Sequence, residues 1–232
     1  MQTTNRTWIS CATSALVLIA AAVALYAGPS PSDQNRLTPR EKKEGFVLLF
    51  NGKDLDGWLG DPVRWHVQDG VIVGSSDSHP FKVNTFLIHD GTFSNFILKG
   101  DIKLRNHNSG VQFRSEQLPG EGWMVRGYQA DASEVGEEKS AWGNLYEERL
   151  RGRNAMKSPD EGWRTGKSLV HHGDWNSYEI RADGDHIRLT FNGVVTIDTH
   201  DKASSKGIIA LQLHAGPEMR VEFRNLKLKK LP

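Results

Sequence analysis

Three short segments of the chain carry a glutamine and an ionisable residue two positions apart, with a non-polar residue between them. They are Gln112-Phe113-Arg114, Gln129-Ala130-Asp131 and Gln212-Leu213-His214. Because strand side chains alternate between the two faces of a sheet, each polar pair shares one face while the residue between them points to the other. If the three strands lie in one sheet, that face is a polar floor that suits a sugar better than an apolar partner.

The ionisable members of these segments are an arginine, an aspartate and a histidine. Converging on one point, they would perturb one another's pKa values, which catalysis uses and binding alone does not require. Simpler interpretations stay open. Arg114 and Asp131 could form a cross-strand ion pair worth about 0.2–1 kcal/mol, and His214, just before Ala215-Gly216-Pro217, could only satisfy a turn carbonyl.

A long segment, residues 132–169, departs from strand periodicity and is rich in charge. A loop of this length in a compact domain is usually either functional or mobile. Its aromatic and ionisable residues include Trp142, Tyr146, Glu147, Arg149 and Lys167. The aromatic rings could form a sugar-stacking wall beside hydrogen-bonding head groups. The alternative is a solvated, charged surface, and Lys167 in particular is either a ligand contact or a solvated side chain.

The elements that must position these residues are almost all strands. Asp69-Gly70, Asp183-Gly184 and Asn192-Gly193 each separate two alternating segments, as in tight hairpins. Further period-two segments are residues 46–50, 85–89, 95–104, 110–114, 128–131, 208–214 and 220–229. Outside the N-terminal segment, no long stretch has helical periodicity. The pattern predicts an all-β, antiparallel two-sheet sandwich of jelly-roll type, with Trp58, Trp65 and Trp175 in its core and a bulge at Asn225.

Composition limits the partners. The chain has 232 residues, 29 Lys and Arg against 28 Asp and Glu, and a formal charge of +1. Nothing in this balance indicates nucleic acid or an anionic membrane surface as a partner.

The N-terminus has the layout of an export signal. Arg6 precedes an apolar run over residues 15–26, and a polar segment follows. We expect a signal peptide or N-terminal anchor over residues 1–28, a linker over 29–44 and one domain over 45–232. An exported protein of the periplasm, cell envelope or extracellular space follows, with no membrane partner beyond that anchor. The single cysteine, Cys11, lies before the apolar run, so a cleaved chain would have no disulfide.

Several blocks of the sequence together carry a family resemblance. They are Leu48-Leu49-Phe50-Asn51-Gly52-Lys53-Asp54-Leu55-Asp56-Gly57-Trp58, Asn108-Ser109-Gly110-Val111-Gln112-Phe113-Arg114-Ser115, Gly127-Tyr128-Gln129-Ala130-Asp131, Gly143-Asn144-Leu145-Tyr146, Trp175-Asn176-Ser177-Tyr178, Leu189-Thr190-Phe191-Asn192-Gly193 and Leu211-Gln212-Leu213-His214-Ala215-Gly216. In this order they resemble the 3-keto-disaccharide hydrolase domain. The resemblance implies a concanavalin A-like or laminin G-like jelly roll, export to the bacterial envelope, and cleavage of glycosides already oxidised to a ketone at C3.

Such a substrate defines the chemistry. The ketone acidifies the C2 proton, so a base can remove it and the aglycone leaves from C1, giving net elimination or, after addition of water, hydrolysis. The hypothesis assigns His214 or Asp131 as base, Arg114 as partner of the enolate, and Glu147 or Tyr146 as acid.

The remaining candidate contacts would bind the glycoside or small oligosaccharide. Gln112, Gln129 and Gln212 would hold sugar hydroxyls. The other substrate-binding candidates are Trp142, Tyr146, Arg149 and Lys167.

Two alternatives stay open. A divalent cation could polarise the ketone, because His107, Asp131, Glu147 and His214 are ligand types, although no tight ligand spacing is present. A non-catalytic, lectin-like carbohydrate-binding module of the cell envelope is the alternative function, since the same fold supports it.

Overall fold

The computed structural model describes residues 34–120, 122–134, 141–152, 155–156 and 160–232. The expected signal segment, residues 1–28, lies outside the described residues, as does the start of the expected linker. Within the described part of the chain, no helix is long and apolar enough to span a membrane.

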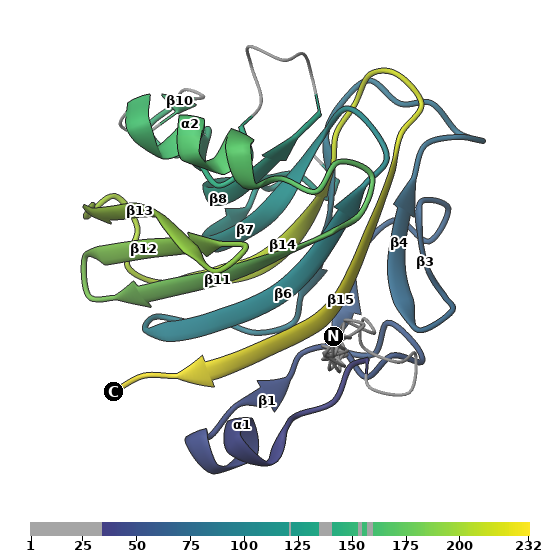
Figure 1. The fold of residues 1–232 in the computed structure, drawn as a ribbon. Coiled ribbons are helices and arrows are strands. Elements are labelled where there is room, and N and C mark those ends of the chain that lie inside the picture. The colour runs from purple at the N-terminus through teal and green to yellow at the C-terminus, as the bar shows by residue number, and fades with distance from the viewer. Residues whose placement is uncertain (1–33, 121, 135–140, 153–154, 157–159) are drawn as a thin grey trace, which may run out of the picture.

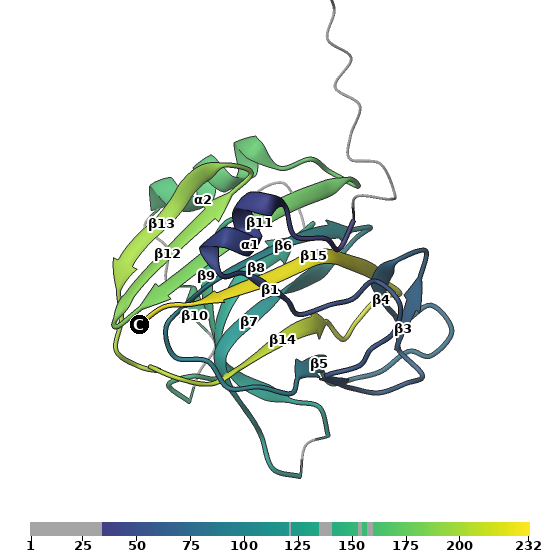
Figure 2. The same cartoon turned by 90° about the horizontal axis from the view of Figure 1, so that it is seen from below.

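Two antiparallel sheets pack face to face (Figure 1, Figure 2). Sheet A has the order β13 (Val194–His200), β12 (His186–Phe191), β11 (Trp175–Asp183), β6 (Phe96–Leu104), β15 (Arg220–Lys230), β4 (Val71–Ser75) and β3 (Trp65–Gln68), with β1 (Val47–Leu48) paired to β15. Sheet B has the order β10 (Ala155–Met156), β9 (Leu145–Glu148), β8 (Val125–Ser133), β7 (Asn108–Gln117), β14 (Ile208–Leu213), β5 (Thr85–His89) and β2 (Trp58–Leu59). The expected all-β sandwich is confirmed, and the three Gly-containing turns join β3 to β4, β11 to β12 and β12 to β13.

The core lies between the sheets, where alternate residues of each strand point inward. Phe113 and Tyr128 from sheet B stack at 5.5 Å between ring centroids, and both are buried. Tyr178 of sheet A reaches across this core. Its hydroxyl donates to the main-chain carbonyl of Asp131 and accepts from the Gly143 N–H at 2.6 Å. These hydrogen bonds tie β8 and the approach to β9 to the opposite sheet.

The expected tryptophans divide into two groups. Trp58 and Trp65 are 5% and 2% exposed, as a core position requires. Trp175 lies instead on the outer face of sheet A, where the Arg224 guanidinium carbon sits 3.9 Å from its ring centroid. The prediction of a core position for Trp175 is therefore wrong, because the strand alternation places Asn176 and Tyr178 inward.

Two helices flank the sheets. The helix α1 (Pro39–Glu44) begins at a capping box in which Thr38 and Glu41 each bond the other's backbone N–H. It falls in the expected linker, yet Asn35 and Asn225 exchange backbone-to-side-chain hydrogen bonds of 2.7 and 2.8 Å. The chain from residue 34 onward is therefore folded onto the domain. The bulge predicted at Asn225 is present, with φ at 56° and a register shift beside it.

The second helix, α2 (Asp160–Leu169), lies in the charged segment where no helix was expected. Its Gly166 packs so closely on Trp142 that an added Cβ would overlap the Trp142 carbonyl oxygen. This close packing holds α2 against Trp142.

A bulge in β7 decides which side chains reach the outer face of sheet B. Phe113 pairs with Tyr128 of β8, but the next pair along is Glu116 with Arg126. Two residues of β7, Arg114 and Ser115, thus lie opposite the single residue Gly127, and Arg114 has a φ of 47°. Ser115 is therefore the next residue after Gln112 whose side chain lies on the outer face of the sheet. The Arg114 side chain does not lie on that face and bonds the backbone of Ser94 and Gly184 instead.

Candidate active site

A cavity of about 230 Å³ opens on the outer face of sheet B, at the end where β8, β9 and β14 carry polar side chains. Its lining includes Gln129, Asp131, Tyr146, Glu148, Gln212 and His214. The register explains this gathering, because Gly110 of β7 pairs with Asp131 of β8 while β14 runs along the other side of β7. Two of the three Gln-containing segments therefore bring their ionisable residues together as expected.

Asp131 is a buried acid of the cavity, only 3% exposed. Its Oδ1 accepts hydrogen bonds from Gln129 Nε2 at 2.8 Å, the Ala132 N–H at 3.1 Å and Asn108 Nδ2 at 3.4 Å. Burial raises the pKa of Asp131 from its ordinary 3.8 to about 7, and the nearby Glu148 carboxylate adds to the rise. Within the described chain no donor reaches Oδ2. This oxygen is therefore the natural place for an exchangeable proton at neutral pH.

Glu148 is the second acid of the cavity and was missed from the sequence. Burial raises its pKa, and Arg149, whose Nε lies 3.8 Å from Oε1, partly opposes the rise. On strand β9 the alternation places Tyr146 and Glu148 on the cavity side and Leu145 and Glu147 on the core side. Strand alternation could have identified Glu148, because it lies two positions from Tyr146 and therefore shares its face of the strand.

Glu147 is thus wrongly assigned as a cavity acid. It is fully buried, and it forms an ion pair with Arg151 away from the cavity. Tyr146 does line the cavity, where burial, Glu148 and Asp131 raise its pKa to about 12. Its hydroxyl stays protonated at neutral pH and can donate a hydrogen bond.

His214 stands at the end of β14 beside these acids. Its Nδ1 lies 2.6 Å from the Ala215 carbonyl oxygen, so the neutral ring carries its proton on Nδ1 and keeps a lone pair on Nε2. Burial lowers the pKa of His214 below its ordinary 6.5, and His107, at 4.7 Å between ring centroids, lowers it further. The turn-carbonyl contact left open by the sequence is present, and it leaves Nε2 available for proton transfer.

The three glutamines form a connected relay. Ser115 Oγ donates to Gln112 Oε1 at 2.8 Å, and Gln112 Nε2 donates to Gln129 Oε1 at 2.7 Å. Gln129 Nε2 then donates to Asp131 Oδ1 and, at 3.2 Å, to Gln212 Oε1. Gln112 is fully buried and does not line the cavity, so the expectation that it holds a sugar hydroxyl is wrong. Its amide orients Gln129 instead.

Arg114 lies away from the cavity, which corrects its assignment to the polar floor. The β7 bulge turns its guanidinium toward backbone carbonyl oxygens of Ser94 at 2.8 Å and Gly184 at 2.7 Å. It therefore clamps β7 to the β11–β12 turn of the other sheet. The cross-strand pair with Asp131 that the sequence left open is not formed.

Of the two rings expected to form an aromatic wall, Tyr146 lines the cavity and Trp142 does not. Trp142 is fully buried and stacks on Phe191 of sheet A at 5.6 Å, so it belongs to the core. Lys167 is exposed on α2, apart from the cavity lining. Arg149 lies outside the cavity lining, with its Nε 3.8 Å from Glu148 Oε1.

Among the residues that the structure describes, no group of three or more His, Cys, Asp or Glu side chains is arranged to hold a metal ion. Glu147, one of the four ligand types named from the sequence, faces the core rather than Asp131 and His214.

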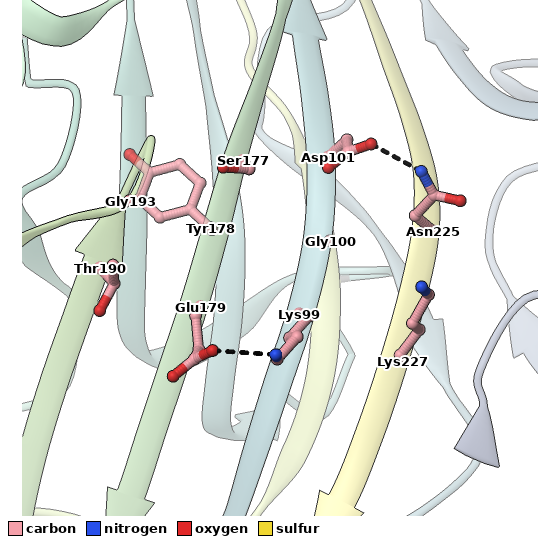
Figure 3. A pocket seen from close by; sticks show the side chains of 10 residues that line it. All are labelled: Lys99, Gly100, Asp101, Ser177, Tyr178, Glu179, Thr190, Gly193, Asn225 and Lys227. Carbon is pink, nitrogen blue, oxygen red and sulfur yellow. Dashed lines mark hydrogen bonds and ion pairs between the residues drawn. The ribbon is translucent and has the colours of Figure 1, made fainter. Parts of the chain in front are cut away.

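A second hollow of about 290 Å³ lies on the outer face of sheet A (Figure 3). Its charged side chains already have protein partners, including Glu41 for Lys227 at 3.0 Å. Lys99 Nζ lies 3.2 Å from Glu179 Oε2, and Asn225 Nδ2 donates to Asp101 Oδ2 at 2.7 Å. This hollow lacks the pKa-shifted acids and the imidazole of the sheet B cavity, which is why the latter is the candidate active site.

A two-sheet sandwich with a polar, acid-containing cavity on one face is typical of carbohydrate-active β-sandwich domains. The chain belongs to the 3-keto-alpha-glucoside-1,2-lyase-like domain family, whose sequence profile matches residues 45–229. The family resemblance expected from the sequence blocks is thereby confirmed. No curated protein sequence matches the chain significantly.

Solved structures agree with this placement. A protein from Parabacteroides distasonis ATCC 8503 named "putative glycosyl hydrolase" is 25% identical, with a TM-score of 0.61, and the match covers 86% of this chain and 100% of that one. The carbohydrate-binding module CBM66 from Bacillus subtilis is 18% identical, with a TM-score of 0.53 over 75% of this chain and 96% of that one. A Bacillus subtilis protein with a galectin-like fold is 14% identical, with a TM-score of 0.54 over 76% and 90%. The last two relatives support the fold alone.

Proposed function

We propose that this protein cleaves 3-keto glycosides at the sheet B cavity, by removal of the C2 proton and loss of the aglycone from C1. The observation that carries the proposal is the buried carboxyl of Asp131, with its pKa raised to about 7, in one cavity with His214 and Glu148. Acids with raised pKa values beside an imidazole in a cavity are typical of proton-transfer sites. Membership of the 3-keto-alpha-glucoside-1,2-lyase-like family supports the same substrate class.

His214 is the base in this scheme. Its lowered pKa keeps the ring neutral at pH 7, and the Nδ1 contact to Ala215 directs the Nε2 lone pair to accept the C2 proton. As the C2–H bond breaks, its electron pair forms a C2–C3 double bond and negative charge moves onto the C3 oxygen.

Asp131 is the acid for the leaving group. A carboxyl with a pKa of about 7 is roughly half protonated at neutral pH, so it can deliver a proton from Oδ2 to the aglycone oxygen. The enolate then re-forms the ketone, a C1–C2 double bond appears, and the C1–O bond breaks. Return of the proton from His214 to Asp131 through water restores the site, and water adding at C1 gives net hydrolysis.

The cavity volume sets the size of what it holds. About 230 Å³ is smaller than the roughly 300–1,000 Å³ of sites for drug-sized ligands. The cavity therefore fits one oxidised sugar ring, with the aglycone directed outward.

The test is incubation of the purified protein with a 3-keto-glucoside or 3-keto-trehalose in D₂O. Release of the aglycone is measured by chromatography, and exchange of the C2 proton is followed by NMR. We expect both in the wild type, and a fall of about 10²–10⁴-fold in cleavage for His214→Gln and Asp131→Asn. His200→Gln is the matched control, because His200 is exposed and paired with Asp185 far along sheet A.

Two outcomes contradict the proposal. Near-normal turnover in both His214→Gln and Asp131→Asn would show that neither residue is catalytic. Binding of the 3-keto sugar with no exchange and no cleavage by the wild type would favour the lectin-like alternative.

A further inference from the structure

We propose that the side-chain amides of Gln212 and Asn84 form a neutral donor pair that stabilises the negative charge on the C3 oxygen of the substrate. This inference rests on the proposed function, since the charge arises only when the C2 proton is removed. The sequence predicted that Arg114 would stabilise the enolate, but the β7 bulge directs its guanidinium away from the cavity. The two amides take over that role.

The relay fixes which end of the Gln212 amide faces the cavity. The Asp131 carboxylate accepts hydrogen bonds, so it must receive the NH₂ end of Gln129. Gln129 Oε1 consequently accepts from Gln112 Nε2, and the second N–H of Gln129 Nε2 donates to Gln212 Oε1. With its oxygen occupied, Gln212 turns its own NH₂ toward the cavity that it lines.

The relay also depends on Gly110, which lies beneath the Gln129 side chain. An added Cβ at this position would sit 2.6 Å from Gln129 Cγ and 2.7 Å from the Ala130 carbonyl oxygen. The absence of a side chain at Gly110 therefore lets Gln129 reach across the floor to both Asp131 and Gln212.

A different donor orients Asn84. The backbone N–H of Ala215 donates to Asn84 Oδ1 at 2.9 Å, and a backbone N–H can only donate. Asn84 must present its oxygen there, which leaves its NH₂ free to point away. Within the described chain, neither the Gln212 nor the Asn84 amide nitrogen donates to any protein group.

The two amides flank the proposed base. Leu213 of β14 pairs with Thr85 of β5, so the next residues along, His214 and Asn84, lie beside each other, and Gln212 precedes His214 by two positions on the same face. All three line one cavity. A C2 proton facing His214 thus has its neighbouring C3 oxygen within the region that the two amides border.

Neutral donors suit this cavity electrically. Its described lining contains neither lysine nor arginine, but two acids, Asp131 and Glu148, whose pKa values burial raises. Donors already oriented in a water-poor site stabilise charge without reorganising, and removing one typically costs about 10²–10³ in kcat.

The test compares Gln212→Met and Asn84→Asp with the wild type and with Gln117→Glu, an exposed glutamine on β7. Gln212→Met keeps side-chain volume but removes the donor, and Asn84→Asp replaces the donor with a second oxygen. We expect C2 exchange in D₂O and cleavage to fall together by about 10²–10³-fold, with KM changed less than fivefold. Gln117→Glu should match the wild type, and circular dichroism checks that each variant is folded.

Exchange rates within fivefold of the wild type in both variants would overturn the donor pair while leaving the proposed function intact. If the wild type shows no exchange and no cleavage, the proposed function fails. The donor pair then fails with it, because the charge that the two amides would stabilise arises only when the C2 proton is removed.

Discussion

Replacement of Asp131 by asparagine should stabilise the folded protein at alkaline pH while it lowers turnover about 10²–10⁴-fold. The carboxyl is 3% exposed, and burial raises its pKa from 3.8 to about 7. Asparagine has nearly the same shape and keeps an oxygen for the Gln129, Ala132 and Asn108 donors, but it never carries the buried charge.

The sign follows from proton binding. In the unfolded chain Asp131 ionises near 3.8, whereas the folded protein keeps the proton until about pH 7. The folded state therefore binds more protons between these values, and its stability falls as the pH rises through that window. The full shift corresponds to about 4 kcal/mol as an upper bound. Below pH 4 the two proteins should differ little, and above pH 7 the variant should be more stable by on the order of 2–4 kcal/mol.

Urea unfolding followed by tryptophan fluorescence measures this difference at pH 4, 5, 6, 7 and 8. We expect the gap between Asp131→Asn and the wild type to grow steadily from pH 4 to pH 7 and then level off. Glu116→Gln, an exposed carboxylate change in the same sheet, serves as the control. A gap that stays constant across this range would refute the buried, protonated carboxyl on which the proton-transfer scheme depends.

Three further predictions concern activity and stability. The pH dependence of kcat/KM should be bell-shaped, rising through a pKa below 6.5 as His214 becomes neutral and falling through a pKa of about 7 as Asp131 loses its proton. The rising limb should disappear in His214→Gln. An unchanged profile in that variant contradicts the assignment. Gly110→Ala should displace Gln129 and lower kcat about 10²-fold, while circular dichroism stays native; full activity would show that the relay is not required. Arg114→Met should lower the free energy of unfolding by about 2–5 kcal/mol, because the backbone carbonyl groups that Arg114 binds lose their donor. The kcat per folded molecule should stay unchanged. Unchanged stability with a reduced kcat would instead indicate a catalytic role for Arg114.

The sandwich could be predicted from the sequence because its signals are local. The turns at Asp69-Gly70 and Asn192-Gly193 have positive φ values at both residues, which these residue types tolerate, and the strands on either side alternate. The helix α2 (Asp160–Leu169) could not be predicted in this way. Its position depends on the close approach of Gly166 to Trp142, a contact between residues distant in the sequence.

The site was predictable only as far as strand alternation holds. Gln129, Asp131, Gln212 and His214 meet as expected because β8 and β14 are regular there. Arg114 departs from the pattern because one extra residue in β7 reverses the facing of every side chain after it.

The charged segment carried a similar ambiguity. Glu147 and Glu148 are adjacent, so an error of one position decides whether a carboxylate faces the core or the cavity. Tyr146 would have resolved the choice, since only Glu148 shares its face.

Tyr178 connects the cavity to the far side of the sandwich. Because its hydroxyl bonds the Asp131 carbonyl and the Gly143 N–H, the backbone beneath the proposed acid is held by a residue of the opposite sheet. Tyr178 in turn packs on Phe191, at 5.0 Å between ring centroids. A change of side-chain volume at Phe191 would thus alter the spacing of the sheets and, through Tyr178, the position of Asp131. Selection for altered substrate preference should therefore recover substitutions deep in the core, at positions that no substrate touches.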